Sequence, residues 1–203
     1  MGLAEHTADT SLPEEDALRA DLYDLMGALL SRPPSGELLA QVSGLTGDAS
    51  DLGNGVNALA RLAATLKPQA IETEFNTLFI GLTRGELLPY ASYYMTGFLH
   101  EKPLALLRND MRKLGIERAP NVYEPEDNMG SLCEMMAGLI RGSFGHDASA
   151  QAQKDFFNTH LAPWAQHFFS DLEGAKASVF YAPVGSIGKA FMEIEREAYR
   201  MGA

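Results

Sequence analysis

Apolar residues recur at the spacing of an α-helix along nearly the whole chain, and this periodicity constrains the fold more than any other feature. The first stripe runs from Leu18 to Leu29 and ends at SRPP (31–34), because proline cannot continue a helix. Comparable segments cover residues 36–43, 56–66, 71–82, 104–114, 125–140, 157–168 and 187–201. Only ASVFY (177–181) resembles a strand, and one strand makes no sheet. The spacing therefore predicts an all-α helical bundle of about seven to nine helices.

Glycine and proline mark the expected breaks between these helices. GLTGDASDLGNG (44–55) has the composition of a loop, and residues 81–97 interrupt the periodicity with glycines and a proline. Pro163 must bend or divide the helix around it. Because the core needs nearly all of the stripes, the 203 residues are expected to form one domain over 1–203, with a disordered N-terminal arm over about residues 1–12.

The composition and charge favour a globular protein and argue against nucleic-acid binding, secretion and insertion into a membrane. Hydrophobic residues make up 46% of the chain and charged residues 21%, which is typical of a globular protein. The formal net charge of -11 argues against nucleic-acid binding, because phosphate recognition needs clustered Lys and Arg. The N-terminus lacks the apolar core of a secretion signal, and no stretch approaches the ~20 apolar residues that span a bilayer. The sequence therefore predicts a cytoplasmic protein.

Sequence motifs for catalysis and metal binding are incomplete or missing. GSIGKA (185–190) lacks both the first glycine and the Ser or Thr of a phosphate-binding loop, so it is interpreted as a flexible start of the last helix. The five histidines do not have the spacing of a metal-binding pair, and there is no G-x-S-x-G. Cys133, the single cysteine, lies in an apolar stripe, where burial would make the thiol unreactive. The prediction is a protein without a metal, a cofactor or a catalytic residue.

Three carboxylates surround a proline in YEPEDN (123–128), just before an apolar stripe. Pro125 suits the first position of a helix, and Glu126 and Asp127 would then lie in its first turn, where the helix dipole favours negative charge. Glu124 is left unexplained by this interpretation, and adjacent carboxylates repel unless a cation or a proton relieves them. The residues thus leave three interpretations open: a helix start, a binding site for a basic group, and a catalytic acid/base pair. The helix start is slightly favoured over the binding site, and the acid/base pair is the least favoured.

Two longer segments resemble a known family. EFNTLFIGLTRGELLPYASYYM (74–95) is similar to the E-x-x-x-L-F-x-G…P-Y-A-S-x-Y signature of the TorD/DmsD/NarJ group of redox-enzyme maturation chaperones. YEPEDNMGSLCEMMAGLI (123–140) resembles the E-P-E-D-H segment of that group and the apolar helix that follows it. LAPW (161–164) and Phe168 resemble a third family feature. The motifs occur in family order, and the remaining helices fit in number and position.

The resemblance implies a function. Members are all-helical cytoplasmic chaperones that bind the twin-arginine (Tat) leader and the apo form of a molybdenum-cofactor oxidoreductase, assist cofactor insertion and prevent premature export. Some members form domain-swapped dimers or bind guanine nucleotide weakly, so the chain is expected to be a monomer or such a dimer. The client could be a formate dehydrogenase, a nitrate reductase, or a dimethyl sulfoxide or trimethylamine N-oxide reductase. The alternatives are a helical accessory subunit of an anaerobic dehydrogenase complex and a carboxylate-dependent nucleotide hydrolase.

The resemblance also assigns residues to a peptide-binding site with an acidic end and an aromatic surface. The peptide-binding set is Tyr90, Tyr93, Tyr94, Met95, Glu124, Glu126, Asp127, Asn128 and Trp164. A second set is expected to shape the backbone, namely Gly81, Gly85, Pro89, Ser92 and Pro125. Asn128 departs from the family pattern, which commonly has a histidine at this position. Asparagine can still donate and accept hydrogen bonds but cannot titrate.

Overall fold

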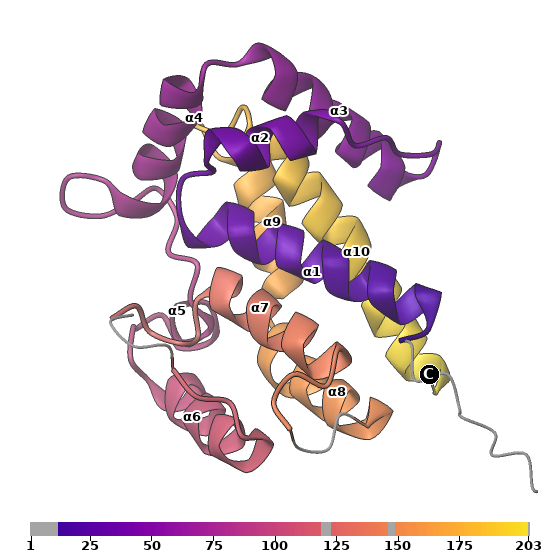
Figure 1. Ribbon diagram of the computed structural model, residues 1–203. Coiled ribbons are helices and arrows are strands. Elements are labelled where there is room, and N and C mark those ends of the chain that lie inside the picture. The colour runs from indigo at the N-terminus through magenta and orange to yellow at the C-terminus, as the bar shows by residue number, and fades with distance from the viewer. Residues whose placement is uncertain (1–11, 119–122, 146–148, 203) are drawn as a thin grey trace, which may run out of the picture.

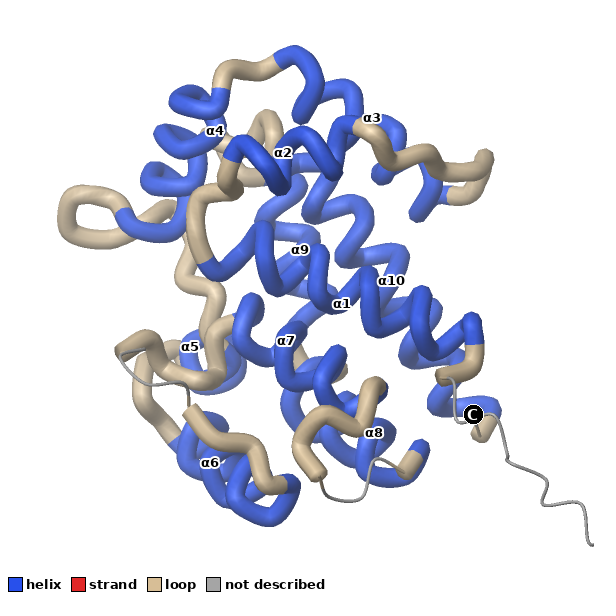
Figure 2. Tube along the Cα trace, in the orientation of Figure 1, coloured by secondary structure: helices blue, strands red, loops and turns tan. Residues whose placement is uncertain are grey.

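The computed structural model describes residues 12–118, 123–145 and 149–202, and helices dominate this part of the chain (Figure 1 and Figure 2). The elements are α1 (Glu14–Ser31), α2 (Gly36–Ser43), α3 (Asp51–Thr65), α4 (Pro68–Phe75), η1 (Asn76–Ile80), α5 (Ala91–Thr96), α6 (Lys102–Leu114), α7 (Met129–Ile140), α8 (Ala150–Phe156), η2 (Phe157–Leu161), α9 (Ala165–Gly174) and α10 (Tyr181–Met201). The π-helical segments η1 and η2 continue α4 and α8. The predicted all-α fold is confirmed, although the described residues form ten α-helices.

Several predicted boundaries shift in the structure. The loop expected over 44–55 ends early, because the Ser50 side chain caps α3 by accepting a hydrogen bond from the Gly53 N–H at 3.1 Å. Pro163 does divide its helix, with η2 on one side and α9 on the other. The N-terminal arm expected over residues 1–12 lies outside the described residues, apart from residue 12.

Two predictions near the C-terminus are wrong. ASVFY (177–181) forms no strand, because its backbone turns into the first residue of α10. GSIGKA (185–190) is not a flexible start of the last helix but lies within α10. Its glycines allow close packing against α9, since a Cβ at Gly185 would lie 2.5 Å from the Glu173 backbone nitrogen and one at Gly188 would lie 2.2 Å from the Phe169 ring.

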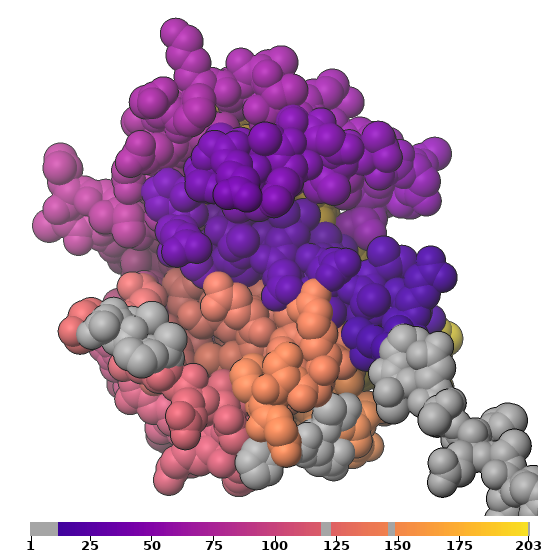
Figure 3. Space-filling view, in the orientation of Figure 1, coloured from indigo at the N-terminus to yellow at the C-terminus, as the bar shows by residue number. Residues whose placement is uncertain are grey.

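Helix α1 crosses the middle of the molecule, with α9 and α10 behind it (Figure 1). It packs along α7, while α10 packs against both α9 and α3. In the space-filling view, α1 forms a band between α2–α4 on one side and α7–α8 on the other (Figure 3). The buried apolar residues of these elements form one cluster whose largest members are aromatic. Among the described residues, no helix combines the length and the apolar character needed to span a membrane.

Glycines on both helices let α1 and α7 approach closely. A Cβ at Gly27 would lie 2.8 Å from Glu134 Cγ and 3.2 Å from the carbonyl oxygen of Gly130. A Cβ at Gly130 would lie 2.5 Å from Ser31 Oγ, so neither position has room for a side chain. The approach brings the Ser31 hydroxyl to Glu134, to which it donates a hydrogen bond at 3.1 Å. The C-terminal half of α1 and the first half of α7 thereby make one continuous surface.

A buried ion pair joins α1 to α10. Arg19 donates from Nε to Glu195 Oε1 at 2.7 Å and from Nη2 to Glu195 Oε2 at 2.9 Å. Glu195 is fully buried, and the Tyr23 hydroxyl also donates to it at 3.0 Å. Arg19 further bonds Tyr199 and Asp16, at 2.6 and 2.7 Å. Because each charge has a partner and several hydrogen bonds, Glu195 can remain ionised although its carboxylate is shielded from water.

Glu74, the first residue of the longer family-like segment, holds the start of α10. Its carboxylate accepts hydrogen bonds from the backbone N–H groups of residues 179, 180 and 181, at 2.8, 3.0 and 2.8 Å. Glu86 accepts hydrogen bonds from the backbone N–H groups of residues 176 and 177, in the connection between α9 and α10, at 2.7 and 3.1 Å. The first N–H groups of a helix have no partner within the helix, so a carboxylate from another element satisfies them and favours the dipole.

Candidate functional site

The turn at 123–128, which begins the second family-like segment, is hydrogen-bonded to the first one. Asp127 accepts a hydrogen bond through its carbonyl oxygen from the Ala91 N–H at 2.9 Å, and Met129 N–H donates to the Pro89 carbonyl at 2.8 Å. Tyr90 and Asn128 lie opposite each other in an isolated antiparallel bridge. The segment before α5 and the segment before α7 are therefore fixed against each other by their backbones.

The helix expected to begin at Pro125 begins at Met129 instead. Asn128 is its N-cap, and its side chain accepts a hydrogen bond from the Gly130 N–H at 2.9 Å. Pro125 lies in the preceding turn, where its carbonyl accepts from the Asn128 N–H at 3.2 Å. Glu126 and Asp127 are thus outside the first turn of α7, which corrects the capping interpretation. Asn128, rather than proline, starts the helix because its side chain satisfies a free N–H group.

Glu126 and Asp127 are both buried, and they bond different partners. Glu126 accepts two hydrogen bonds from Arg108, at 3.0 and 2.8 Å, and lies 3.7 Å from Arg118. Burial opposes its charge, yet the Arg108 hydrogen bonds and the nearby positive charges hold its pKa below the ordinary value. Asp127 accepts from the Ser92 N–H at 2.8 Å, near the start of α5. These contacts give both carboxylates a scaffolding position, and they do not form the facing pair that an acid/base mechanism requires.

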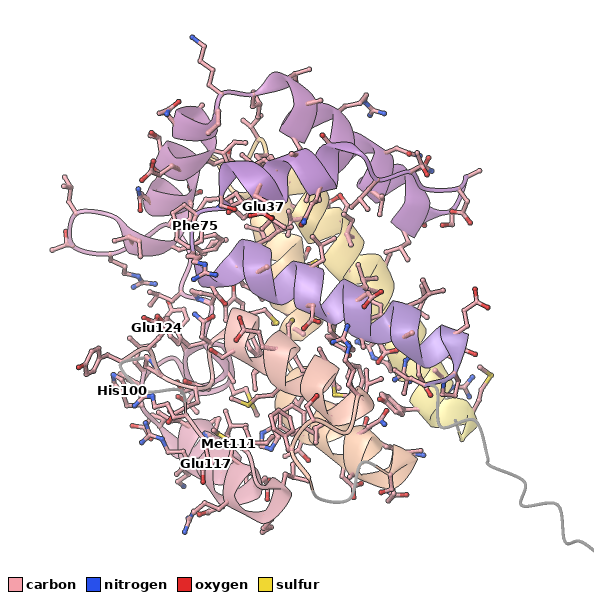
Figure 4. The ribbon with its side chains drawn as sticks, in the orientation of Figure 1. Glu37, Phe75, His100, Met111, Glu117 and Glu124 are labelled. Carbon is pink, nitrogen blue, oxygen red and sulfur yellow. The ribbon has the colours of Figure 1, made fainter. Side chains whose placement is uncertain are left out.

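Glu124 is exposed and faces a cavity of about 670 Å³ between α1, η1 and α7. In Figure 4, Phe75 and Glu124 are labelled on either side of the C-terminal end of α1. The lining combines acidic, basic and apolar groups, and comprises Asp24, Ala28, Leu30, Ser31, Arg32, Phe75, Phe79, Ile80, Pro89, Tyr90, Glu124, Asn128, Ser131 and Glu134. Both long family-like segments contribute lining residues, so segments that are apart in the sequence meet at one cavity.

Two carboxylates of this cavity have no cationic partner within the described part of the chain. Glu124 accepts a hydrogen bond from the Tyr90 hydroxyl, and Glu134 accepts one from Ser31. Neither makes a salt bridge to a described residue, whereas Asp24 pairs with Arg141 at 2.5 Å. Burial and the neighbouring Glu124 raise the pKa of Tyr90, so its hydroxyl stays protonated as a donor. The cavity thus offers two acceptor groups for a cation beside an apolar wall.

Of the aromatic residues predicted to form the peptide-binding surface, one lines this cavity and the others make contacts elsewhere. Tyr90 lines the cavity, but Tyr93 stacks under Arg84 at 5.0 Å and accepts its hydrogen bond at 2.5 Å. Tyr94 packs on Trp164 with ring centroids 5.3 Å apart, and its hydroxyl donates to Asp171. Trp164 is only 1% exposed and donates its indole N–H to the His160 carbonyl. Met95 is 45% exposed but does not line this cavity.

The residues predicted to shape the backbone lie at crowded, buried or hydrogen-bonded positions. Gly81 has a φ of 64°, and a Cβ there would lie 1.9 Å from the Arg84 carbonyl oxygen. A Cβ at Gly85 would lie 2.5 Å from the Leu78 carbonyl oxygen. Ser92 is fully buried, and Pro89 both lines the cavity and accepts the Met129 N–H. These contacts fix the path of the chain between η1 and α5.

Several lining residues were missed by the sequence interpretation. Phe75, Phe79 and Ile80 lie within the first family-like segment, so that segment was the signal that could have identified them. Glu134 lies within the second family-like segment, which was the corresponding signal. The lining residues of α1 carry no such signal, because the α1–α7 crossing alone brings them to the cavity. Cys133 does behave as predicted, since it is fully buried and burial raises the pKa of its thiol.

Known proteins are similar to this chain in sequence and fold. Chaperone protein TorD of Vibrio cholerae serotype O1 is 28% identical over 198 residues, covering 88% of this chain and 90% of that protein. The Tat proofreading chaperone DmsD of Salmonella typhimurium is 28% identical over 137 residues, covering 65% of each. A redox enzyme maturation protein of Archaeoglobus fulgidus has the same fold, with a TM-score of 0.59 and 20% identity over 87% of this chain and 94% of that one. Residues 46–170 match the family described as nitrate reductase delta subunit, so the chain belongs to this family of TorD/DmsD/NarJ redox-enzyme maturation proteins.

Proposed function

We propose that this protein is a non-enzymatic, cytoplasmic chaperone that binds the twin-arginine leader and the apo form of a molybdenum-cofactor oxidoreductase. In this role it would assist cofactor insertion and delay export until the client is complete. One observation carries the proposal: the two long family-like segments meet at a cavity that combines unpaired carboxylates with an apolar wall. The family to which the chain belongs, and relatives named as chaperones, support the same role.

The chemistry of the cavity suits the chemistry of such a leader. Two adjacent arginines offer planar guanidinium groups, which form charge-assisted and often bidentate hydrogen bonds with carboxylates. Glu124 and Glu134 are the acceptors that no described cation already occupies. The apolar segment that follows the arginines would contact Phe79, Ile80 and Pro89. The net charge of -11 would also steer a basic peptide toward the protein.

Calorimetry with synthetic leaders tests the proposal. The full chain is titrated with twin-arginine leaders taken from genes beside its own, and with the same peptides carrying two glutamines in place of the arginines. We expect binding of the arginine peptides that weakens as salt is added, and much weaker binding of the glutamine peptides. Equal affinity for both peptides, or no binding of any leader, would contradict leader recognition.

The partners need a separate experiment, because leader binding and client binding are different properties. We propose that the protein copurifies with the leader-bearing precursor of its client and leaves once the leader is removed. Stoichiometric copurification with the mature enzyme would instead support an accessory subunit. Weak guanine nucleotide binding and a domain-swapped dimer stay predictions of the family resemblance, and the leader proposal requires neither.

A further inference from the structure

We infer that the recognised leader carries a carboxylate beside its two arginines, and that Arg32 receives this carboxylate in the same cavity. The inference rests on the proposed function and adds to it an acidic residue as part of the recognised peptide. It assigns a role to the guanidinium of the cavity lining, which the sequence motifs did not mark and the leader arginines do not use.

Arg32 directly follows α1, is exposed and lines the cavity. Among the described residues its side chain makes no hydrogen bond, ion pair or ring contact. Most other arginines of the chain do have side-chain partners, as Arg108 has in Glu126 and Arg141 has in Asp24. A guanidinium carries five N–H donors and no acceptor. Arg32 therefore brings into the cavity a set of donors that no described group of the protein uses.

The backbone holds Arg32 at the cavity. Arg32 is the C-cap of α1, with φ -163° and ψ 163°, and Pro33 and Pro34 follow it. A residue before proline is restricted to extended conformations, so the Cα of Arg32 is fixed while its side chain keeps its rotamers. Figure 4 shows the end of α1 between the labelled Phe75 and Glu124. Binding an anion at Arg32 therefore costs side-chain freedom but little ordering of the backbone.

The charges of the cavity do not suit a purely basic ligand. Asp24 is already paired with Arg141. The unpaired charges of the lining are then the carboxylates of Glu124 and Glu134 and the guanidinium of Arg32. Two leader arginines compensate the carboxylates but repel Arg32, and charges in a partly enclosed site are screened less than charges on an open surface. A carboxylate on the same peptide compensates Arg32 as well, so every unpaired charge of the lining then has a partner.

A carboxylate matches Arg32 better than the other acceptors of a peptide do. The planar guanidinium binds a carboxylate through charge-assisted and often bidentate hydrogen bonds, whereas a main-chain carbonyl or a hydroxyl accepts weaker, neutral ones. The peptide must supply this carboxylate, because Arg32 pairs with none of the three carboxylates that line the same cavity. The recognised segment is therefore one of mixed charge, with two basic residues and an acidic neighbour.

Calorimetry with paired peptides tests this inference. The peptides are the twin-arginine leaders described above, with Asp or its neutral isostere Asn placed directly before or directly after the arginine pair. The proteins are wild type, Arg32→Gln and the control Arg61→Gln. Arg61 is a matched control because it is also an exposed arginine without a side-chain partner among the described residues, and it lies outside this cavity.

The expected result is a preference that depends on Arg32. With wild type, one of the two Asp peptides should bind about threefold to tenfold more tightly than its Asn counterpart, which is the size of a partly exposed, charge-assisted pair. With Arg32→Gln the preference should reverse, because the added carboxylate then faces only Glu124 and Glu134. Arg61→Gln should keep the wild-type preference.

The ratio of Asp to Asn affinities separates this role from the ordinary role of a cation at the end of a helix. Such a cation interacts favourably with the helix dipole, but this contribution needs no ligand and cancels in the ratio. The inference is overturned if wild type prefers neither Asp peptide, or if the ratio is the same in wild type and Arg32→Gln. A common loss of affinity would then indicate a main-chain contact and a common gain would indicate simple repulsion, and leader binding would stand in both cases. If wild type binds no leader, the proposed function fails and the inference fails with it.

Discussion

The buried pair between Arg19 and Glu195 allows a stability change to be calculated from the structure. Arg19→Met removes both hydrogen bonds that Glu195 receives from the guanidinium and leaves the Tyr23 hydroxyl as its donor at 3.0 Å. Because the carboxylate is fully buried, the substitution should cost about 3–5 kcal/mol of unfolding free energy. That is a large share of the roughly 5–15 kcal/mol typical of a domain. Combining it with Glu195→Leu removes the stranded charge and leaves mainly an unsatisfied Tyr23 hydroxyl, at about 1–3 kcal/mol.

Urea unfolding followed by circular dichroism measures these differences by linear extrapolation. The double variant should therefore be more stable than Arg19→Met alone, although it carries one more substitution. Lys189→Met is the control, because the Lys189–Glu173 pair has side chains 39% and 37% exposed and should contribute less than about 1 kcal/mol. The reasoning is refuted if Arg19→Met costs as little as the control, or if the double variant is the least stable of the set.

Three further predictions concern residues of the family-like segments. Glu74→Gln weakens the charged cap on α10 and should cost about 1–2 kcal/mol, lowering the midpoint in calorimetry by roughly 2–8 °C, whereas an unchanged midpoint would contradict the capping role. Iodide should not quench the fluorescence of Trp164 in the folded protein but should do so in urea, and quenching in the folded state would contradict its burial. Burial raises the pKa of Glu126, but the hydrogen bonds and the positive charges of Arg108 and Arg118 together hold it below the ordinary value, so its stabilising contribution is complete above about pH 4.5 and disappears as the pH falls through the folded pKa. Urea midpoints measured from neutral to acid pH should fall less steeply in Glu126→Gln, and identical slopes would contradict the ion pair.

The fold could be predicted from periodicity because each helix buries one face in a common core. The stripe from Leu18 to Leu29 becomes α1, and the division at Pro163 occurs where the sequence requires it. Two errors come from local caps, Ser50 on α3 and Asn128 on α7, and another comes from a side chain in a distant part of the sequence. Residues 177–181 have strand-like composition, but Glu74 binds three of their backbone N–H groups and starts α10 there.

The candidate site was predictable only in part. The family-like segments identify Tyr90, Glu124 and Asn128, which do line the cavity. Sequence alone could not show that Glu126 is paired and Glu124 is not, because the difference depends on Arg108, which lies on α6. Glu134 was still harder to identify, since its position follows from the glycines that allow α1 and α7 to meet. Contacts between distant elements, rather than local spacing, thus determine which carboxylates are available.

The acidic turn therefore has two kinds of carboxylate with different physical roles. Glu126 is paired with Arg108, so its charge is compensated within the protein. Asp127 accepts one backbone N–H group through Oδ2 and is turned into the fold, where its Oδ1 is buried. Glu124 is supported by a neutral hydroxyl, which orients the carboxylate without cancelling its charge. A site for a guanidinium needs this second arrangement, because a carboxylate already paired with an internal arginine gains little from exchanging it for another. The fixed turn and the available charge are thus parts of one arrangement, in which internal hydrogen bonds and the Glu126–Arg108 pair fix the turn that carries the unpaired carboxylate of Glu124.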